Sequence, residues 1–380
     1  MRRVVYVTGT RADYGLFSEP LKRVREAGLE LSLIVTGMHL EKAFGNTVTE
    51  IEKDAMPIAA RVPILTGGDA GGDQARSVGN AVLGITAALE DLKPELVIVL
   101  GDRGEMLAAA IAATHLNIAV AHVHGGEVSG TVDELVRHAI SKLSHVHFAA
   151  TEEAADRLRR MGERPEHVHV VGAPGLDYLS RFAPVPDGEL ASDLKLDLSK
   201  SFVIFTQHPV TLEVDEAAKQ MQTSLEALEA AHVQVVATYP NSDAGGRAMI
   251  EVLESWSGRE WLRVVPSLGQ RRLASLMRRA SAMAGNSSSG IIEAPFFGLP
   301  VVNIGTRQEG RLRADNVVDV PYDVNAIRAA VECALTDETF IARARKSRNP
   351  YGDGHAGERI VEVLRSLDVG PALLDKRLTF

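Results

Sequence analysis

Residues 96–103 read Leu96-Val97-Ile98-Val99-Leu100-Gly101-Asp102-Arg103, five apolar residues in a row followed by a glycine and two charged residues. A second apolar run, Ile118–Ala121, leads into His122-Val123-His124-Gly125-Gly126-Glu127. Short uninterrupted apolar runs are typical of strands that are buried on both faces of a parallel sheet. Because ligands bind just beyond the carboxyl ends of such strands, we predict a chemical role for the charged clusters.

Apolar runs of this kind alternate with helix-like stretches along most of the chain. The strand-like Val4–Val7 precedes the amphipathic Phe17–Ala27, and the pattern restarts at Phe202–Thr206 after a proline-rich break. Such alternation predicts βαβ units with parallel sheets. We therefore expect an α/β protein with two doubly wound, Rossmann-like domains and a ligand cleft between them. The expected domains are residues 1–180 and 181–355, followed by a C-terminal helical segment, 356–380.

The composition excludes several classes of protein. The 380 residues carry a formal net charge of −9 and a sequence pI near 5.8, whereas a nucleic-acid-binding protein would present a basic surface. Cys333 is the only cysteine, so no intramolecular disulfide can form. The apolar run after the N-terminus is too short for a signal peptide, and no apolar segment has the length of a membrane span. We expect a soluble, cytoplasmic protein that binds neither nucleic acid nor membrane.

The charged residues beyond the two strands are candidates for acid–base chemistry. Carboxylates and imidazoles that converge in a cleft are the usual general acids and bases of enzymes. The candidates are Asp102 after the first strand, His124 and Glu127 after the second, and Asp133 and Glu134 in the following stretch. Arg103 and Arg137 are interspersed with them and are candidates for contacting an anionic substrate.

A metal site is the alternative reading of the same region. His122 and His124 are two residues apart, so a strand would place both imidazoles on one face. That geometry also suits two metal ligands. Asp102 is followed directly by Arg103, however, and a guanidinium there would repel a cation. The sequence therefore favours an acid–base site without a bound metal.

Two glycine-containing turns predict phosphate binding. Thr8-Gly9-Thr10-Arg11-Ala12-Asp13-Tyr14-Gly15 follows a strand and opens a helix, where backbone N–H groups and the helix dipole favour an anion. The alternative is an ordinary turn with Arg11 on the surface. Gly285-Asn286-Ser287-Ser288-Ser289-Gly290 has more hydroxyl groups than one helix cap needs. Glu293, one turn further on, could accept hydrogen bonds from ribose.

These motifs occur in an order that resembles the hydrolysing UDP-N-acetylglucosamine 2-epimerases, which supply N-acetylmannosamine for sialic-acid synthesis. The resemblance covers nearly the whole chain. It rests on residues 9–15, Gly101-Asp102-Arg103, His124 to Glu127, Asp133 to His138, Gln207-His208-Pro209, Tyr239-Pro240-Asn241 and Gly285 to Ser288.

The resemblance implies a glycosyltransferase-B-like fold whose C-terminal helix crosses back to the first domain. It implies a UDP-linked sugar as substrate, no cofactor and no metal, and a homodimer or higher homo-oligomer. In the implied reaction the C2 proton and the nucleotide leave together to give a glycal. Water then adds to the glycal and releases a free sugar with C2 inverted.

Roles for individual residues also come from the resemblance. Asp102 and Asp133 match acid–base carboxylates, and Glu134 lies beside the second of these. Relatives carry either Glu or His at the position of His124, so Glu127 could take part in its place. The positions that match nucleotide or diphosphate ligands are Arg11, His208, Asn241, Ser287, Ser288, Glu293 and Arg307.

Other functions fit parts of the sequence. An epimerase of the legionaminic-acid pathway, acting on a 2,4-diacetamido-2,4,6-trideoxy sugar, shares these motifs. A glycosyltransferase could use the same fold and the same nucleotide loops but would need an acceptor. A metal-dependent hydrolase could use His122 and His124, and would lose its activity on chelation.

Overall fold

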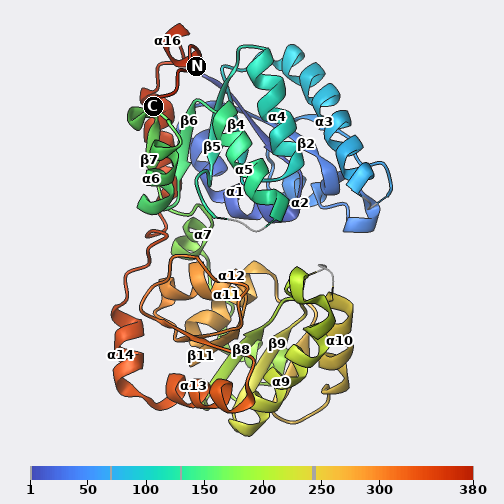
Figure 1. Ribbon diagram of the computed structural model, residues 1–380, viewed down its shortest axis with the longest axis vertical. Helices are drawn as coiled ribbons and strands as arrows, with labels where there is room; N and C mark the ends of the chain where they lie inside the picture. Colours follow the sequence, from blue (N-terminus) through green and yellow to red (C-terminus); the bar gives the residue numbers. More distant parts are fainter. Residues whose placement is uncertain (1, 69–70, 129–130, 242–244, 380) are drawn as a thin grey trace. The chain divides into compact units, whose positions relative to one another are not determined.

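The computed structural model describes residues 2–68, 71–128, 131–241 and 245–379. The chain forms two compact units, Met1–Ser180 with Tyr351–Phe380 and Arg181–Pro350, called unit 1 and unit 2 below. Each unit is a parallel β-sheet with helices on both faces (Figure 1). Every described helix is too short or too polar to cross a membrane.

Unit 1 contains a seven-stranded sheet in the order β3-β2-β1-β4-β5-β6-β7. The strands are β1 (Arg3–Thr8), β2 (Glu30–Thr36), β3 (Ile58–Val62), β4 (Leu96–Leu100), β5 (Ala119–Val123), β6 (Val146–Ala149) and β7 (Val168–Val170). The helices are α1 (Arg11–Glu26), α2 (Val48–Lys53), α3 (Gly71–Leu92), α4 (Gly104–His115), α5 (Thr131–Leu143), α6 (Glu152–Arg160), α7 (Gly175–Arg181), α15 (Ala356–Ser366) and α16 (Pro371–Leu374).

Unit 2 contains a six-stranded sheet in the order β10-β9-β8-β11-β12-β13. The strands are β8 (Phe202–Thr206), β9 (Gln234–Thr238), β10 (Leu262–Val265), β11 (Ala282–Gly285), β12 (Val301–Ile304) and β13 (Val317–Val320). The helices are α8 (Asp187–Leu194), α9 (Ala217–Ala230), α10 (Gly246–Ser255), α11 (Gly269–Arg279), α12 (Ser288–Ile292), α13 (Val324–Thr336) and α14 (Glu338–Lys346).

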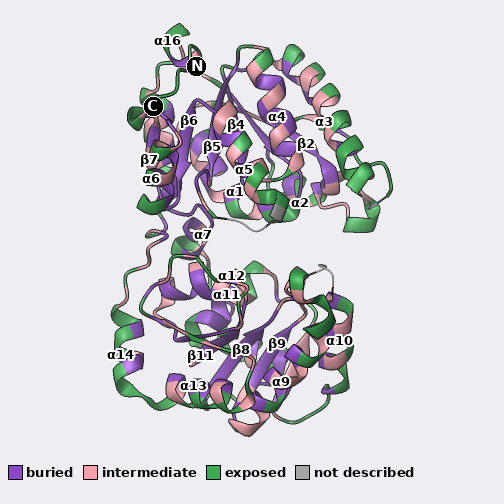
Figure 2. Cartoon of the chain, in the orientation of Figure 1, coloured by how far each residue is buried: buried purple, intermediate pink, exposed green. Residues whose placement is uncertain are grey.

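The strand β4 shows why its sequence is continuously apolar. Side chains on a strand alternate between the two faces of the sheet. Leu96 and Ile98 belong to one buried cluster and Val97 and Val99 to another, on the opposite face. The central strands of both units are accordingly buried along their length (Figure 2).

The strand β5 is longer at its carboxyl end than the sequence predicts. The expected apolar strand, Ile118–Ala121, stops before His122, whereas the parallel ladder with β4 continues through His122 and Val123, so that His122 is a strand residue, as the metal-site alternative assumed. The polar His122 is tolerated there because both ring nitrogens are hydrogen-bonded. Its Nε2 lies 2.7 Å from the Gly101 carbonyl oxygen and its Nδ1 lies 3.1 Å from the Ser141 hydroxyl.

The chain returns to unit 1 through α15, which packs against α1. The buried Asp177 carboxylate accepts the backbone N–H groups of Ala356 and Gly357, at 2.8 and 2.7 Å, and so satisfies the start of α15. Arg23 of α1 forms an ion pair of 2.8 Å with Glu358. This packing joins α15 to α1, the first helix of the chain.

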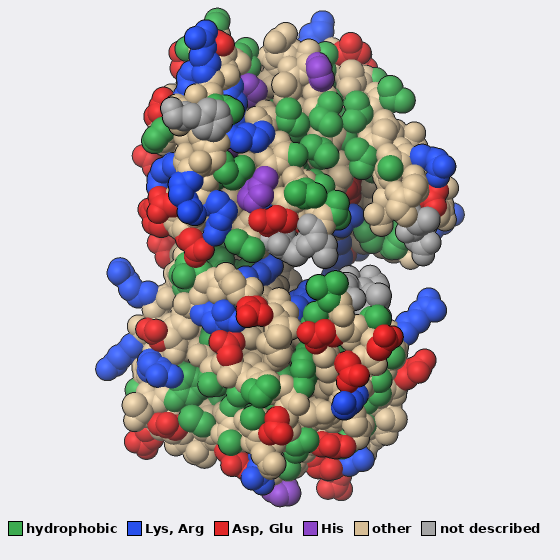
Figure 3. Space-filling model, viewed as in Figure 1, with side chains coloured by type: hydrophobic (Ala, Val, Ile, Leu, Met, Phe, Trp, Pro, Cys, Tyr) green, Lys and Arg blue, Asp and Glu red, His purple; other side chains and the backbone are tan. Residues whose placement is uncertain are grey.

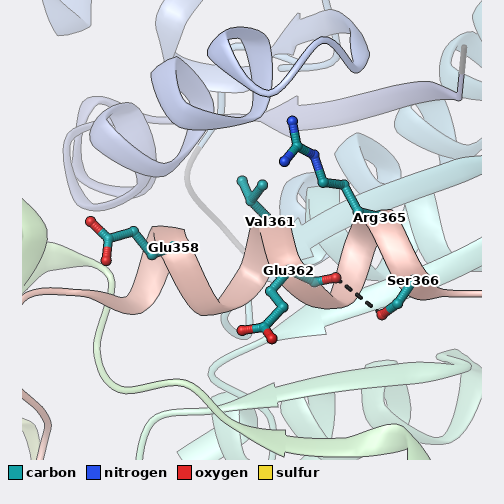
Figure 4. A pocket seen from close by; sticks show the side chains of 5 residues that line it. All are labelled: Glu358, Val361, Glu362, Arg365 and Ser366. Atoms are coloured by element: carbon teal, nitrogen blue, oxygen red, sulfur yellow. Dashed lines mark hydrogen bonds between the residues drawn. The ribbon is translucent and has the colours of Figure 1, made fainter.

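The outer side of α15 lines a surface pocket (Figure 4). Its lining residues are Glu358, Val361, Glu362, Arg365 and Ser366. The second half of α15 lies near the amino end of β1, because Arg2, just before that strand, donates to the Leu364 carbonyl oxygen. Ligands of doubly wound sheets bind at the opposite, carboxyl edge of the strands. We therefore do not assign this pocket to the active site.

The last residues of the chain are anchored to unit 1 by a buried carboxylate, Glu163. Its side chain is 2% exposed and contacts Lys142 at 2.9 Å, His147 at 2.9 Å and Lys376 at 2.6 Å. Burial alone would raise the pKa of Glu163, but the hydrogen bonds from His147, Lys376 and Lys142 lower it to about 2. The Thr379 amide also donates to the Gly162 carbonyl oxygen, at 2.9 Å.

Glu163 is expected to make stability fall in acid. A carboxylate whose pKa is depressed by folding stabilises the protein above its unfolded pKa, and this contribution is lost as the pH falls through the folded value. The window runs from about 4.5 down to about 2, and the full contribution is about 3 kcal/mol. The difference in unfolding free energy between the wild type and Glu163→Gln, from urea titrations, should stay constant above pH 5 and shrink toward pH 3. A difference that does not change with pH would contradict this assignment.

Candidate active site

Both sheets have a topological switch point, where the strand order reverses direction. In unit 1 it lies between β1 and β4, and in unit 2 between β8 and β11. Loops that leave neighbouring strands at such a point diverge to opposite faces of the sheet and leave a crevice for a ligand. Most of the candidate residues from the sequence lie in the loops at the carboxyl ends of these strands and of their neighbours.

Arg137 joins the ends of β4 and β5. It lies on α5, and its guanidinium is almost fully buried. One terminal nitrogen donates to the carboxylate of Asp102 and the other donates to the His124 carbonyl oxygen, at 2.7 Å. Asp102 is half-buried. Arg137 thereby holds its carboxylate in place at the end of β4.

His124 is held in an unusual backbone conformation. Its φ of +62° lies in the left-handed region, which costs a non-glycine residue about 1 kcal/mol or more. Its Nδ1 lies 2.5 Å from the Glu127 carboxylate. An ionised carboxylate can accept a hydrogen bond but cannot donate one. In the neutral imidazole the proton is therefore on Nδ1, and Nε2 carries the lone pair. The pair of Glu127 and His124 has the chemistry of an oriented proton acceptor.

His122 takes no part in such chemistry. Because the Gly101 carbonyl can only accept, Nε2 of His122 carries the proton and Nδ1 faces the Ser141 hydroxyl. Burial lowers its pKa to about 3, so the ring stays neutral. Both nitrogens are occupied, which removes His122 as a metal ligand. Across the described ranges, no group of three His, Cys, Asp or Glu side chains is placed to hold a metal ion.

The two acidic residues in the first turn of α5, Asp133 and Glu134, lie on the same helix as Arg137. Asp133 is exposed in the first turn, four residues before Arg137, a spacing that puts both on one helical face. Glu134 is directed along a neighbouring face and contacts His138 Nε2 at 2.9 Å. Asp133 therefore lies on the Arg137 face of α5, while Glu134 is oriented toward His138.

The turn after β1 differs from the expected phosphate loop. The backbone N–H groups of Gly9 and Thr10 donate to the buried carboxylate of Asp13, at 3.1 and 2.8 Å, and the Thr10 hydroxyl also contacts it. These amides are thus occupied by the chain itself, contrary to the expectation of free donors. Burial raises the pKa of Asp13 to about 6. The spacing of Thr10 and Asp13 is that of a capping box, a signal in the sequence that could have identified this role.

Arg11 and Arg103 lie on either side of this turn. Arg11 is exposed and forms an ion pair with Glu50 at 3.2 Å. Arg103 Nε donates to the buried Glu105 carboxylate at 3.0 Å. Gly9 leaves room for this carboxylate, because a Cβ on it would lie 2.4 Å from a Glu105 carboxylate oxygen and would force that side chain to move. Sequence reasoning missed Glu105, which holds Arg103 at the start of α4.

In unit 2 the loops after β8 and β11 are tied together by Asn286, which is fully buried. Its side-chain oxygen accepts the His208 backbone N–H at 2.6 Å, and its amide nitrogen donates to the His208 carbonyl at 2.9 Å. The Asn241 backbone N–H in turn donates to His208 Nδ1, at 2.9 Å, so the neutral ring carries its proton on Nε2. Asn286 was not among the expected site residues, although it lies within the motif that was.

The loop after β12 joins the same arrangement. Arg307 and Gln308 both donate to the Asn286 backbone carbonyl, at 3.2 and 2.8 Å. Gly285 allows the close approach of β11 to β8, because its φ is +117° and a Cβ would lie 2.0 Å from the Thr206 carbonyl oxygen. Three separate loops of unit 2 thus meet around one buried asparagine.

The serine-rich stretch begins a short helix, α12. The Ser287 hydroxyl accepts the Ser289 N–H at 3.3 Å and caps the helix, which was the simpler of the two expectations for this motif. Ser288 is the first residue of the helix. Burial raises the pKa of Glu293, and a hydrogen bond from Ser289 offsets only part of that rise. Binding of a nucleotide by Ser287, Ser288 and Glu293 stays a prediction.

Comparisons with known proteins agree on one group of enzymes. A family model described as UDP-N-acetylglucosamine 2-epimerase matches residues 22–365. The chain is 44% identical to a hydrolysing UDP-N,N'-diacetylbacillosamine 2-epimerase of Legionella pneumophila, over 99% of both chains. It is 33% identical to a UDP-N-acetylglucosamine 2-epimerase of Neisseria meningitidis, over 99% of this chain and 98% of the relative.

A solved structure resembles the whole chain as well. It is that of the UDP-GlcNAc 2-epimerase from Neisseria meningitidis bound to UDP-GlcNAc, with a TM-score of 0.81 at 20% identity. The match covers 96% of this chain and all of the solved one. It confirms the expected glycosyltransferase-B-like class, an α/β fold with two Rossmann-like units.

Proposed function

The chain belongs to the UDP-N-acetylglucosamine 2-epimerase family, among its hydrolysing members, and from this we propose that it hydrolyses a UDP-linked 2-acetamido sugar with inversion at C2. The observation that carries the proposal is the arrangement of Asp102, His124, Glu127 and Arg137 at the ends of β4 and β5. It offers a carboxylate and an oriented imidazole at the edge of the sheet where ligands bind.

UDP-N,N'-diacetylbacillosamine is the first substrate that we propose. The support is the 44% identity, over almost the full length, to a relative named for that sugar nucleotide. UDP-N-acetylglucosamine, which the order of the sequence motifs favours, is the second candidate, supported by the relative with 33% identity. The two donors share the uridine diphosphate and the 2-acetamido group, so the same chemistry at C1 and C2 would serve both.

The reaction proceeds in two steps. A base removes the C2 proton, the electron pair forms the C1–C2 double bond, and the C1–O bond to the diphosphate breaks to release UDP. Water then adds across the double bond, with hydroxide at C1 and a proton at C2 from the face opposite to the one that was deprotonated. The products are UDP and a free sugar with the opposite configuration at C2.

In this proposal the residues of unit 1 transfer the protons. Asp102, oriented by Arg137, and Asp133 act as acid and base on C2, and the pair of His124 and Glu127 carries a proton in one of the two steps. Because the C2 proton is only weakly acidic, base strength alone cannot supply the rate. Cations and N–H groups that stabilise the departing diphosphate lower the barrier, about tenfold in rate for each 1.36 kcal/mol.

The residues of unit 2 bind the UDP group in this proposal. His208 and Asn241 are held together by the hydrogen bonds around Asn286. Arg307 donates to the backbone carbonyl of Asn286. Imidazole and guanidinium N–H groups suit diphosphate oxygens. Arg11, Arg103, Ser287, Ser288 and Glu293 are further proposed contacts of the substrate.

Product analysis in heavy water tests this function. The purified protein is incubated in D₂O with UDP-N,N'-diacetylbacillosamine or with UDP-N-acetylglucosamine, and the products are followed by NMR. We expect UDP and a free sugar inverted at C2 with one deuterium there, and faster turnover of the first donor. A product that stays linked to UDP would contradict hydrolysis, and release of UDP only with an added acceptor would indicate a glycosyltransferase.

The expected homo-oligomer and the cytoplasmic location stay predictions. The exposed apolar side chains of unit 1 include Leu83 of α3 and Val132 and Leu135 of α5. Figure 3 shows apolar side chains on one face of unit 1. Exposed apolar patches are common at protein interfaces. Sedimentation velocity at several protein concentrations would measure the oligomeric state directly.

A further inference from the structure

The catalytic helix α5 ends in contact with the last residues of the chain. Lys376 Nζ lies 3.1 Å from the Ser141 carbonyl oxygen, 3.0 Å from that of Lys142 and 2.6 Å from that of Ser144. The last carbonyl groups of a helix have no partners within the helix and carry the negative end of its dipole. A half-buried ammonium group from a segment more than 230 residues away therefore caps α5.

The segment that carries Lys376 is itself held in place. Lys376 also contacts the buried Glu163 carboxylate, and the same carboxylate binds Lys142 of α5. Arg164 donates to the backbone carbonyls of Ala372 and Asp375, at 3.4 and 3.3 Å. The ammonium is thus attached on one side to α5 and on the other to a fixed anion.

The same helix places the groups of the candidate active site. Arg137 lies one turn before Ser141 and reaches Asp102 and the His124 carbonyl. The Ser141 hydroxyl meets His122, whose other nitrogen contacts the Gly101 carbonyl, next to Asp102. A helix moves as a rigid rod with a rise of 1.5 Å per residue. A small axial shift of α5 would therefore displace Arg137 and Asp133 together, and active sites tolerate only about 0.5 Å.

We infer that Lys376 is a positioning residue for the reaction, which clamps the C-terminal end of α5 and so sets the position of Arg137 in its middle and of Asp133 in its first turn. This inference rests on the proposed function. It assigns a role in catalysis to the C-terminal segment, which none of the sequence motifs includes.

Lys376→Met tests the inference, since it keeps the aliphatic stem and removes the charge and the three donors. A misplacement of about 1 Å can cost about 100-fold in rate. We expect kcat to fall 10- to 100-fold while KM and the Kd for UDP stay within about twofold. Lys376→Arg, which keeps the charge and the donors, should recover much of the loss, and Lys376→Gln serves if the Met variant does not fold.

The control is Arg377→Ala, the neighbouring residue. Arg377 is 77% exposed and pairs with Asp375. The Arg377→Ala substitution should leave kcat unchanged. Hydrogen–deuterium exchange gives a second readout that needs no activity: amides of residues 137–143 should exchange at least tenfold faster in Lys376→Met, and those of α9 at the wild-type rate.

Each result decides the matter. Wild-type kcat in Lys376→Met, the same loss in Arg377→Ala, or unchanged exchange in α5 would overturn the inference. If the wild-type protein turns over neither donor, the proposed function fails, and the exchange experiment still shows whether Lys376 clamps α5.

Discussion

Asp102→Asn is expected to lower kcat about 10³-fold while the affinity for UDP stays at the wild-type value. Asparagine has the shape of aspartate and can still accept a hydrogen bond from Arg137, so the ends of β4 and β5 should stay joined. It cannot take up a proton, however, and general acid–base catalysis by one positioned group is worth about 10²- to 10⁴-fold. The substitution therefore removes the chemistry and keeps the geometry.

Two measurements separate the chemical role of Asp102 from a structural one. The initial rate of UDP release gives kcat and KM, and titration calorimetry gives the Kd for UDP. Asp156→Asn is the matched control, because Asp156 is exposed on α6 and pairs with Arg159. Full activity in Asp102→Asn would show that another group removes the C2 proton, with Asp133 as the next candidate. A parallel loss of UDP binding would instead indicate a structural role.

Asn286→Ala is expected to weaken UDP binding by one to two orders of magnitude and to destabilise unit 2. The substitution leaves the backbone N–H and carbonyl of His208 without the partners that they have at 2.6 and 2.9 Å. Each buried polar group left unsatisfied costs about 1–3 kcal/mol. Every 1.4 kcal/mol that is lost in positioning His208 and Asn241 lowers affinity about tenfold.

The test of Asn286→Ala combines calorimetry with UDP, carried out well below the melting temperature, and urea unfolding. Asn325→Ala, on the exposed side of α13, provides the control for loss of an asparagine side chain in the same unit. A variant that is destabilised but binds UDP with wild-type affinity would show that Asn286 serves folding only. Wild-type stability together with wild-type affinity would show that its hydrogen bonds contribute nothing measurable.

The sequence was informative wherever function depends on residues next to a strand end. Asp102, His124 and Glu127 follow apolar runs directly, and a parallel sheet places all such ends at one edge. The family was recognisable for the same reason, since its motifs are these strand ends in a constant order. The role of Asp13 could also be predicted from local spacing, because a capping box spans only four residues, here Thr10 to Asp13.

The length of a strand was less predictable. His122 lies just beyond the apolar run Ile118–Ala121, and an ionisable side chain in a buried strand is costly unless it is hydrogen-bonded. Its two partners, Gly101 and Ser141, lie 21 and 19 residues away, and neither is identifiable before the sheet and α5 are assembled. The same holds for Asn286, whose partner His208 is 78 residues distant.

The sequence by itself determined the fold class, the family and the residues at the strand ends, because these depend on periodicity and on neighbours along the chain. Tertiary structure alone decided which side chains hold those residues in place: Arg137 at Asp102, Asn286 at His208, and Lys376 at the end of α5. The physical reason is that a hydrogen bond acts over about 3 Å. Its partners can come from any part of the chain, and only folding brings them within that distance.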